Sequence, residues 1–434
     1  MSRWLSLSFA SAWSRRAALT LVVFSVAVSV TLLLMVAQIR ADARGSFSSA
    51  VSGVDLLVGS RGSATELLMY SVFQLGRPTR NIPADTEERV AAVPGVSWVL
   101  PLQHGDSYRG FAVWGTRTEF FERFRVRAES LQWTAGRAFA DPRDLGLKSV
   151  FELVLGADVA ERFGHSVGDA IVLTHGAGGP LSHQHTQSPF TVVGILAPTG
   201  GPVDRAVLVS VEGFEAIHLG WGIGELQGLG GRMVDHEPAP RAAAIQELNP
   251  TEVTSLLVGL ESRTRVFAVQ RAIEAIPGEP LMAVLPGVAL DELWRALAIG
   301  ESSLFLVGGL VVLASVMSVS AVLLVSLSLR RREFAVLRAI GARPQGVLFM
   351  VLLESLLVCS FGLLLGALAQ QVLVLIAFDW MRVEFGIVLE ILSVPKEGWW
   401  ALGASLLLSA LVSLIPAWRA YQLSLKDGLN PPYV

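Results

Sequence analysis

The chain has 434 residues, of which 52% are hydrophobic and 16% charged, and its formal net charge is -3. This apolar bias argues against a purely water-soluble protein, and a slightly acidic chain without basic patches interleaved with aromatic residues implies no nucleic-acid partner. Because Cys359 is the only cysteine, no intrachain disulfide is possible, and any water-exposed domain must be held together by its own packed core.

Four long, predominantly apolar stretches of the sequence contain no charged residue. They run over Ala17–Ile39, Ser302–Leu329, Ser355–Phe378 and Gly398–Trp418. A helix that crosses the roughly 30 Å hydrocarbon layer of a membrane needs about 20 predominantly apolar residues. We therefore predict four transmembrane helices.

The first apolar stretch has an alternative interpretation. It follows Arg15 and Arg16 and precedes the tripeptide Ala41–Ala43, an arrangement that also suggests a secretory signal with a cleavage site. The apolar region of such a signal covers only about 7–15 residues. The stretch is longer than this, which favours an uncleaved helix.

The segment between the first two apolar stretches has the pattern of a folded aqueous domain. Short β-rich runs bounded by Gly, Pro or Asp recur in it, and helix-period segments such as Thr86–Gly95 lie among them. The β-rich runs are Val96–Leu102, Gly110–Gly115, Phe151–Gly156, Ala170–Gly176, Phe190–Leu196 and Ala206–Val211. Strands this short and this irregularly connected do not suit a doubly wound sheet, so the pattern predicts an α+β domain.

Two further features of this segment concern its connection to the membrane. The stretch Gly59–Ser63 is rich in Gly and Ser, and we expect a loop that turns close to the membrane surface, followed by an amphipathic helix over Ala64–Leu75. A helical period also runs from Ala289 into the second apolar stretch without a breaker. A helix that passes unbroken from the outer domain into the membrane can carry motion between them.

Histidines raise the question of a metal. His175, His183 and His185 lie close together along the chain, around a Gly-rich stretch, and imidazole is a common ligand of zinc and copper. A closed structural zinc site needs four ligands, and no cysteine is available outside the apolar stretches. Solvated loop histidines are therefore the alternative to a metal site.

The segment Arg330–Gly346 separates the second and third apolar stretches. Arg330, Arg331 and Arg332 stand where the second helix would leave the bilayer, and Glu333–Ile340 is rich in good helix formers. Gly341 can end a helix in the left-handed conformation, and Pro344 prevents the helix from resuming. We predict a short amphipathic helix on the membrane surface, for which a simple interfacial connector is the alternative.

This segment resembles the helix–turn of the permease subunits of MacB/LolE/FtsX-type ABC transporters, whose pattern runs roughly R-x-R-E-x-x-x-L-R-A-I-G-A. The stretches Leu348–Gly366 and Ile415–Pro431, and several landmarks of the outer segment, are also similar to that family. The resemblance implies a coupling helix that docks on a separate ABC ATPase subunit. The residues that it assigns to coupling are Glu333, Leu337, Arg338, Ile340, Gly341 and Ala342.

The resemblance also implies partners and a mechanism. In such proteins four spans work as a dimer, so we expect a homodimer in a 2:2 complex with an ATPase that binds ATP and Mg²⁺. The work of the ATPase is relayed to the periplasmic domain, which acts on lipoproteins, peptides or adaptor proteins, while the cargo does not pass through the spans. This mode of action is called mechanotransmission.

The sequence itself indicates a subunit without hydrolytic activity of its own. A P-loop needs a Gly-rich turn that ends in Lys followed by Ser or Thr, and the lysines of this chain are Lys148, Lys396 and Lys426, none in that context. We therefore expect no enzyme activity and no cofactor in this chain, and an ATPase in a separate chain.

Arginines on the short flanks predict the orientation. They gather before the first stretch, at Arg3, Arg15 and Arg16, and again between the second and third stretches. Lys and Arg accumulate on cytoplasmic flanks, so both termini are predicted to be cytoplasmic. The family resemblance implies that the membrane is the inner membrane of a bacterium. The predicted parts are a cytoplasmic N-terminus (1–16), span one (17–39), a periplasmic α+β domain (40–301), span two (302–329), the coupling helix (330–346), span three (347–378), a periplasmic loop (379–397), span four (398–418) and a cytoplasmic tail (419–434).

Two other functions stay open at this stage. An FtsX-like scaffold would use the same four spans to switch a periplasmic partner such as a cell-wall hydrolase, although such scaffolds usually carry a much smaller outer domain. A membrane-anchored domain with a metal-linked or enzymatic function would leave the capped basic helix without a role.

Overall fold

The computed structural model describes residues 16–76, 78, 80–142, 147–176, 188–218, 250–329, 336 and 343–426. The chain divides into two compact units. The helical unit contains the chain up to Ala43, then Leu297–Met381, and the chain from Leu389 onward. The α+β unit contains Arg44–Ala296 together with the short segment Arg382–Val388.

Within the described residues, four helices are long and apolar enough to cross a membrane. They are α2 (Arg16–Ala50), α13 (Pro286–Leu329), α15 (Pro344–Phe385) and α16 (Lys396–Lys426). Each contains one of the predicted apolar stretches, and the α+β domain is inserted between the first and the second helix. The predicted fold class is confirmed.

The helices extend beyond the apolar stretches from which they were predicted. Helix α13 is continuous from Pro286 to Leu329, which confirms the unbroken helix expected there, and α2 continues to Ala50. An uncharged stretch marks the part of a helix that suits lipid, whereas a helix continues as long as its backbone hydrogen bonds do. Helix α15 begins at Pro344, where the missing N–H of the proline leaves no hydrogen bond unmade.

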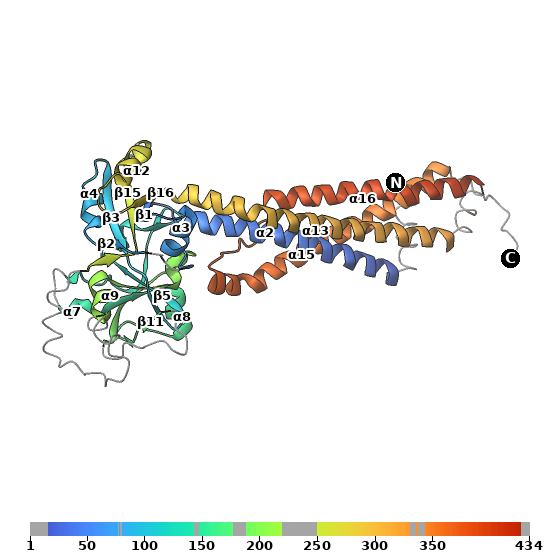
Figure 1. Ribbon diagram of the computed structural model, residues 1–434. Helices are drawn as coiled ribbons and strands as arrows, with labels where there is room; N and C mark the ends of the chain where they lie inside the picture. Colours follow the sequence, from blue (N-terminus) through green and yellow to red (C-terminus); the bar gives the residue numbers. More distant parts are fainter. Residues whose placement is uncertain are drawn as a thin grey trace, which may run out of the picture. The chain divides into compact units, whose positions relative to one another are not determined.

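In the described part of the α+β unit, one sheet has four strands in the order β16-β1-β15-β3. The strands are β1 (Leu56–Ser60), β3 (Val96–Leu102), β15 (Ser255–Leu260) and β16 (Leu281–Val284), and all neighbours are antiparallel. Helices α4 (Thr86–Ala91) and α12 (Val266–Glu274) lie along this sheet (Figure 1).

Gly59 lies in strand β1 and not in the loop expected for Gly59–Ser63. A Cβ atom at Gly59 would lie 2.6 Å from Leu67 Cδ1, so α3 (Ala64–Val72) packs closely against the strand at this point. The close approach of the helix explains the glycine. Gly62, the other glycine of this stretch, lies between β1 and α3, where the turn was expected.

The second sheet has eight described strands, of which seven follow the order β10-β12-β9-β13-β5-β4-β11, while β8 pairs with β12. Its pairing is mixed, because β9 and β12 are parallel, β5 and β13 are parallel, and β9 and β13 are antiparallel. The strands are β4 (Asp106–Tyr108), β5 (Phe111–Thr116), β8 (Trp133–Gly136), β9 (Glu152–Leu155), β10 (Ala170–Ile171), β11 (Thr174–His175), β12 (Phe190–Leu196) and β13 (Ala206–Ser210). All six predicted β-rich runs contain strands.

The described part of the domain also contains short elements. Two small strand pairs are β2 (Ile82–Pro83) with β14 (Glu252–Val253), and β6 (Arg125–Val126) with β7 (Glu129–Ser130). The other helices among the described residues of this domain are α5 (Phe120–Arg123), α7 (Leu147–Val150), α8 (Ala157–Phe163), α9 (Val211–His218), η1 (Pro202–Arg205) and η3 (Arg263–Arg265).

Alternating side chains of the central strands build three cores. In β13, Leu208 points into a core shared by the two sheets, while its neighbours Val207 and Val209 point into a core with α8 and α9. In β1, Leu57 belongs to the shared core, and Leu56 belongs to a core with α4 and α12. Both faces of β1 and β13 are thus buried, which is why these two strands read as continuous apolar runs.

Candidate functional site

The residues predicted to couple this chain to an ATPase lie outside the described residues. These are Glu333, Leu337, Arg338, Ile340, Gly341 and Ala342. Of the predicted segment 330–346, the structure describes Val336, which is 61% exposed, and Arg343–Gly346. The assignment of coupling residues therefore stays a prediction, and the geometry of the candidate site comes from the helices and from the α+β domain.

Hydroxyl groups join the four long helices. Ser29 of α2 lies 2.6 Å from Ser315 of α13, oxygen to oxygen, and Thr31 of α2 donates to the Gly366 carbonyl of α15 at 3.0 Å. Two further contacts, between Ser355 and Ser413 at 2.5 Å and from Ser320 to the Val412 carbonyl at 3.3 Å, join α16 to α15 and to α13. Such contacts specify helix packing in lipid, where apolar side chains gain no hydrophobic free energy by associating.

Two glycines bring α15 against α2. A Cβ atom at Gly366 would lie 2.7 Å from the Ala27 carbonyl oxygen, and one at Gly362 would lie 2.8 Å from Val26 Cγ1. The residues are four apart, so both face the same side of α15. Small residues at this spacing let two helix backbones approach closely.

An ion pair also joins α2 and α13 near the end of their apolar parts. Arg40 Nε lies 2.8 Å from Glu301 Oε2, and the Arg40 guanidinium lies 5.5 Å from the centre of the Phe305 ring. The Glu301 side chain is 15% exposed, so the pair is better shielded than an ordinary surface ion pair.

The ends of α2 and α13 that lie in the α+β unit pack in its core. Phe47 of α2 stacks on Phe73 with ring centres 4.4 Å apart and meets the edge of Trp294 of α13 at 5.7 Å. Ala50 and Leu290 belong to the core shared by the two sheets. Because this core is close-packed, α2 and α13 cannot shift in it without repacking both sheets.

The connector between α15 and α16 is tied to α2. Asp42 Oδ2 accepts hydrogen bonds from Gln38 Nε2 at 2.7 Å and from the Glu390 N–H at 3.1 Å. The segment 379–397 was expected to be a loop, but α15 continues to Phe385, and residues 386–395 alone connect it to α16. The connector is therefore short and fixed by side-chain hydrogen bonds.

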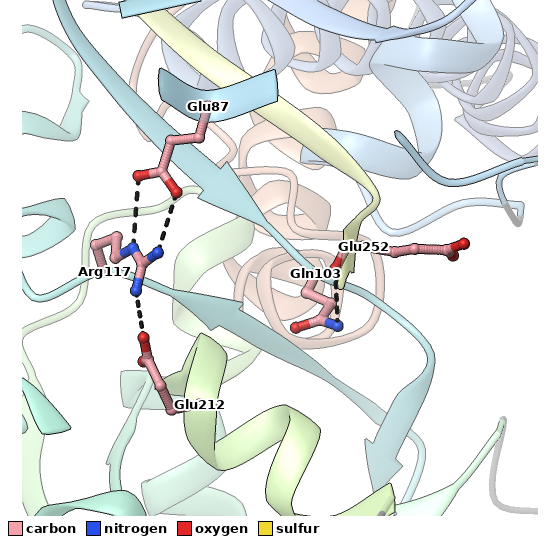
Figure 2. Close-up of polar contacts among 5 residues, drawn as sticks. All are labelled: Glu87, Gln103, Arg117, Glu212 and Glu252. Atoms are coloured by element: carbon pink, nitrogen blue, oxygen red, sulfur yellow. Dashed lines mark hydrogen bonds and ion pairs between the residues drawn. The ribbon is translucent and has the colours of Figure 1, made fainter. Parts of the chain in front are cut away.

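The α+β domain has two lobes, the four-stranded sheet with α4 and α12 and the larger sheet with α8 and α9. An arginine joins them (Figure 2). Arg117 follows β5 of the larger sheet, and its guanidinium forms ion pairs with Glu87 of α4, at 3.1 Å, and with Glu212 of α9. The side chains of Arg117 and Glu212 are 14% and 8% exposed. The two carboxylates come from opposite sides of the junction, so one guanidinium holds both lobes.

Backbone pairing adds to this junction. Gln103, which follows β3, exchanges two backbone hydrogen bonds of 2.9 Å with Gly115 of β5. Its side chain donates to the Glu252 carbonyl at 3.2 Å (Figure 2). The two sheets are thus linked by a short β-bridge. No sequence pattern predicted that Arg117 or Gln103 would lie at this junction.

Of the three histidines considered as metal ligands, the structure describes His175. His175 Nδ1 lies 3.0 Å from Asp106 Oδ1, whereas His183 and His185 lie outside the described residues. Among the residues that the structure describes, no group of three His, Cys, Asp or Glu side chains could hold a metal ion. Another histidine, His104, stays neutral at physiological pH because burial lowers its pKa to about 4.

Comparison with known families gives two matches. The model of the MacB-like periplasmic core domain matches residues 17–276, and the model of the FtsX-like permease C-terminal domain matches residues 305–425.

Comparison with individual proteins gives shorter or weaker similarities. A protein named "Macrolide export ATP-binding/permease protein MacB", from two strains of Campylobacter jejuni, is 29% identical over 109 residues. The aligned part is 25% of this chain and 16% of the relative's length. Among solved structures, the periplasmic region of MacB from Actinobacillus actinomycetemcomitans has 10% identity and a TM-score of 0.34, covering 57% of this chain and 97% of that one. The extracellular domain of the noncanonic ABC-type transporter YknZ from Gram-positive bacteria has 14% identity and a TM-score of 0.31, covering 53% and 98%.

Proposed function

Since the chain belongs to the MacB/FtsX-type permeases of ABC transporters, we propose that it transmits the ATP cycle of a separate ATPase to its own α+β domain. The observation that carries this proposal is the continuity of α2 and α13, which are single helices from their apolar parts into the core of the two sheets. A helix is stiff along its axis, and a close-packed core moves as a body. A displacement of these helices is thereby passed on to the domain.

The coupling segment supplies the other end of this transmission. We propose that Leu337 and Ile340 make apolar contact with the ATPase, that Arg338 pairs with an acidic group on it, and that Gly341 makes the turn. ATP and Mg²⁺ would be bound by the ATPase, since the sequence of this chain has no P-loop. The chain itself is then a subunit without catalytic activity.

The assembly and its surroundings belong to the same proposal. We propose a homodimer that binds two ATPase subunits, in the inner membrane of a bacterium, with both termini in the cytoplasm and the α+β domain in the periplasm. The arginines that flank the first apolar stretch and follow the second support this orientation. The domain would act on a lipoprotein, a peptide or other cargo taken from the periplasm or the membrane, with or without an adaptor protein.

Two other functions receive less support. An FtsX-like scaffold that regulates a cell-wall hydrolase would use the same spans, but the size of the α+β unit, Arg44–Ala296, counts against it. A metal-linked function is not favoured by any group of described side chains.

The first test is purification of the protein from its native membranes in detergent, followed by mass spectrometry. We expect a stoichiometric ABC ATPase to be recovered. Recovery of a cell-wall hydrolase without an ATPase, from intact protein with an accessible cytoplasmic face, would support the scaffold instead.

The second test uses variants of the coupling segment in proteoliposomes with that ATPase. Leu337→Asp and Gly341→Pro should leave the protein inserted and lower the stimulated ATPase rate about tenfold, since losing a central apolar contact typically weakens an interface by more than 1 kcal/mol. Val167→Asp, at an exposed valine of the α+β domain, is the control for an added carboxylate. Unchanged stimulation in both coupling variants would refute the assignment.

A further inference from the structure

Residues 389–395, which lead from the connector into α16, belong to the helical unit, and we call them the return segment. The Leu392 N–H donates to Gln371 Oε1 at 3.1 Å, and Gln371 Nε2 donates to the Ser393 carbonyl at 3.1 Å. Gln371 lies inside the uncharged stretch of α15, about two turns, or roughly 12 Å, before Asp379. The chain therefore folds back to a depth that the apolar stretch of α15 occupies.

Contacts with α2 give the same depth. Val394 packs in the apolar cluster that contains Leu34, and a Cβ atom on Gly398 of α16 would lie 2.8 Å from Val394 Cγ1 and 3.2 Å from Leu34 Cδ2. Leu34 lies about one and a half turns before Arg40, whose ion pair with Glu301 stands at the end of the apolar parts. The return segment thus lies on the apolar side of that ion pair.

Polar side chains of two helices pair with the backbone of the return segment. Besides the two bonds made by Gln371 of α15, the Glu390 N–H donates to Asp42 Oδ2 of α2 at 3.1 Å. The Glu390 carbonyl accepts from Gln38 Nε2 at 3.4 Å. Non-helical backbone is tolerated at membrane depth only where its polar groups find partners, and these side chains supply them.

The apolar side chains of the return segment point away from the protein. Leu392 is 83% exposed and Ile391 is 44% exposed. The backbone of Leu392 is left-handed, with a φ of 60°, a conformation that costs a leucine free energy and a glycine almost none. Leucine at such a turn gains nothing from water or from the core, so its side chain suits an apolar environment outside the chain.

The neighbouring residues suit the boundary between lipid and water. Trp399 and Trp400, which follow the segment in α16, are 64% and 81% exposed, and tryptophan is enriched at membrane interfaces. Glu390, Lys396 and Glu397 are also exposed. Charged side chains near helix ends extend toward the headgroups, so these residues fit the interface and not the centre of the bilayer.

We propose that the return segment lies in the lipid interface of the membrane, with Ile391 and Leu392 inserted among phospholipid acyl chains. The segment then holds the beginning of α16 at a fixed depth beside Leu34 of α2. This inference requires that the four long helices span a membrane, and it does not depend on an ATPase.

The test places a nitroxide spin label at Leu392→Cys in the full-length protein, in phospholipid nanodiscs. Electron paramagnetic resonance measures its collisions with oxygen, which concentrates among acyl chains, and with a water-soluble nickel chelate. The buried Cys359 stays in place, and the wild type treated with the same reagent gives the background. We expect the label at Leu392 to collide more with oxygen than with the chelate.

Two reference positions calibrate the measurement. Leu407→Cys, at a 63% exposed leucine in the apolar stretch of α16, is the lipid reference, and Val167→Cys, at a 45% exposed valine of the α+β domain, is the water reference. Values at Leu392 that match those at Val167 place the segment in water and overturn the proposal. Low collision rates with both reagents show that protein covers the segment and also overturn it, and spin–spin broadening would identify that protein as a second copy of the chain.

A second label tests whether the leucine side chain holds the segment in lipid. In the Ile391→Cys protein, Leu392→Asp should shift the label from the lipid values toward the water values, because a carboxylate is costly among acyl chains. Leu392→Met, which keeps an apolar side chain, should leave the label unchanged. An Ile391 label that keeps its lipid values in the Leu392→Asp protein overturns the insertion of Leu392.

Discussion

Asp158 and Asp204 are two buried carboxylates whose surroundings differ. Asp204 compensates its burial with donors from Thr199 and Gly200, whereas Asp158 has fewer donors and a pKa of about 6. A carboxyl group whose pKa rises from 3.8 to about 6 carries a penalty of about 3 kcal/mol when it is ionised at neutral pH.

We predict that Asp158→Asn stabilises the full-length protein at high pH. The folded-state pKa lies above the unfolded one, so the stabilisation from the bound proton is complete below pH 3.8 and is lost as the pH rises through about 6. Thermal unfolding in detergent should therefore show a gain of up to about 3 kcal/mol at pH 8 and almost none near pH 4.

Asp169→Asn is the control for this experiment. The Ser166 N–H and the His165 side chain lower the pKa of Asp169, which has the opposite sign, so this variant should not gain stability at pH 8. An Asp158→Asn protein whose unfolding temperature equals that of the wild type at pH 8 would contradict the assigned burial.

Among the elements, the packing of α15 on α2 depends on glycine more than on large apolar side chains. Gly362 and Gly366 lie against Val26 and the Ala27 carbonyl. Cys359, one turn before them, is fully buried in the same cluster. The helix pair has no room for an added methyl group at these positions, and its closeness places Thr31 within hydrogen-bond distance of α15.

We predict that Gly366→Ala loosens this helix pair. Overpacking costs about 1–3 kcal/mol, so opening of the pair should increase roughly tenfold. Because Cys359 is the only cysteine, the rate of its alkylation by N-ethylmaleimide in nanodiscs measures that opening by mass spectrometry.

Gly403→Ala in α16 is the matched control, since a Cβ atom there meets no atom within 4 Å. Both substitutions raise helix propensity equally, and they differ only in what the methyl group contacts. Equal alkylation rates in the two variants would show that Gly366 does not set the distance between α2 and α15.

The whole molecule is organised by pairings between distant parts of the chain. Strand β1 pairs with β15 and β16 from the far end of the α+β segment, and the larger sheet is inserted between them in sequence. The two sheets are joined by their shared apolar core and by the junction where Gln103 pairs with Gly115. Arg117 holds that junction with its two carboxylates.

We predict that Arg117→Ala destabilises the α+β domain by about 3 kcal/mol, because it leaves the buried Glu212 without its positive partner. Thermal unfolding of the full-length protein measures this loss. Arg137→Ala is the comparison, since Arg137 is 58% exposed in its pair with Glu152, and it should change stability by less than about 1 kcal/mol. Equal losses would mean that the junction is not held by Arg117.

The sequence by itself determined the four long helices, the α+β class, the unbroken α13 and the strands that stand alone as apolar runs between Gly, Pro or Asp. These features follow from local signals, namely the length of an uncharged stretch and the periodicity of buried positions. The six coupling residues, Glu333, Leu337, Arg338, Ile340, Gly341 and Ala342, also come from the sequence, through a family pattern, and they stay a prediction because they lie outside the described residues.

Only the tertiary structure decided the rest. Gly59 reads locally as a loop residue, and it becomes part of a strand because β15 and β16 pair on either side of β1. Arg117 and Asp158 carry no local pattern, since the ion pairs of Arg117 and the burial of Asp158 depend on other elements. The physical reason is that backbone periodicity is a property of neighbouring residues, whereas burial and charge pairing depend on which distant segments the fold brings together.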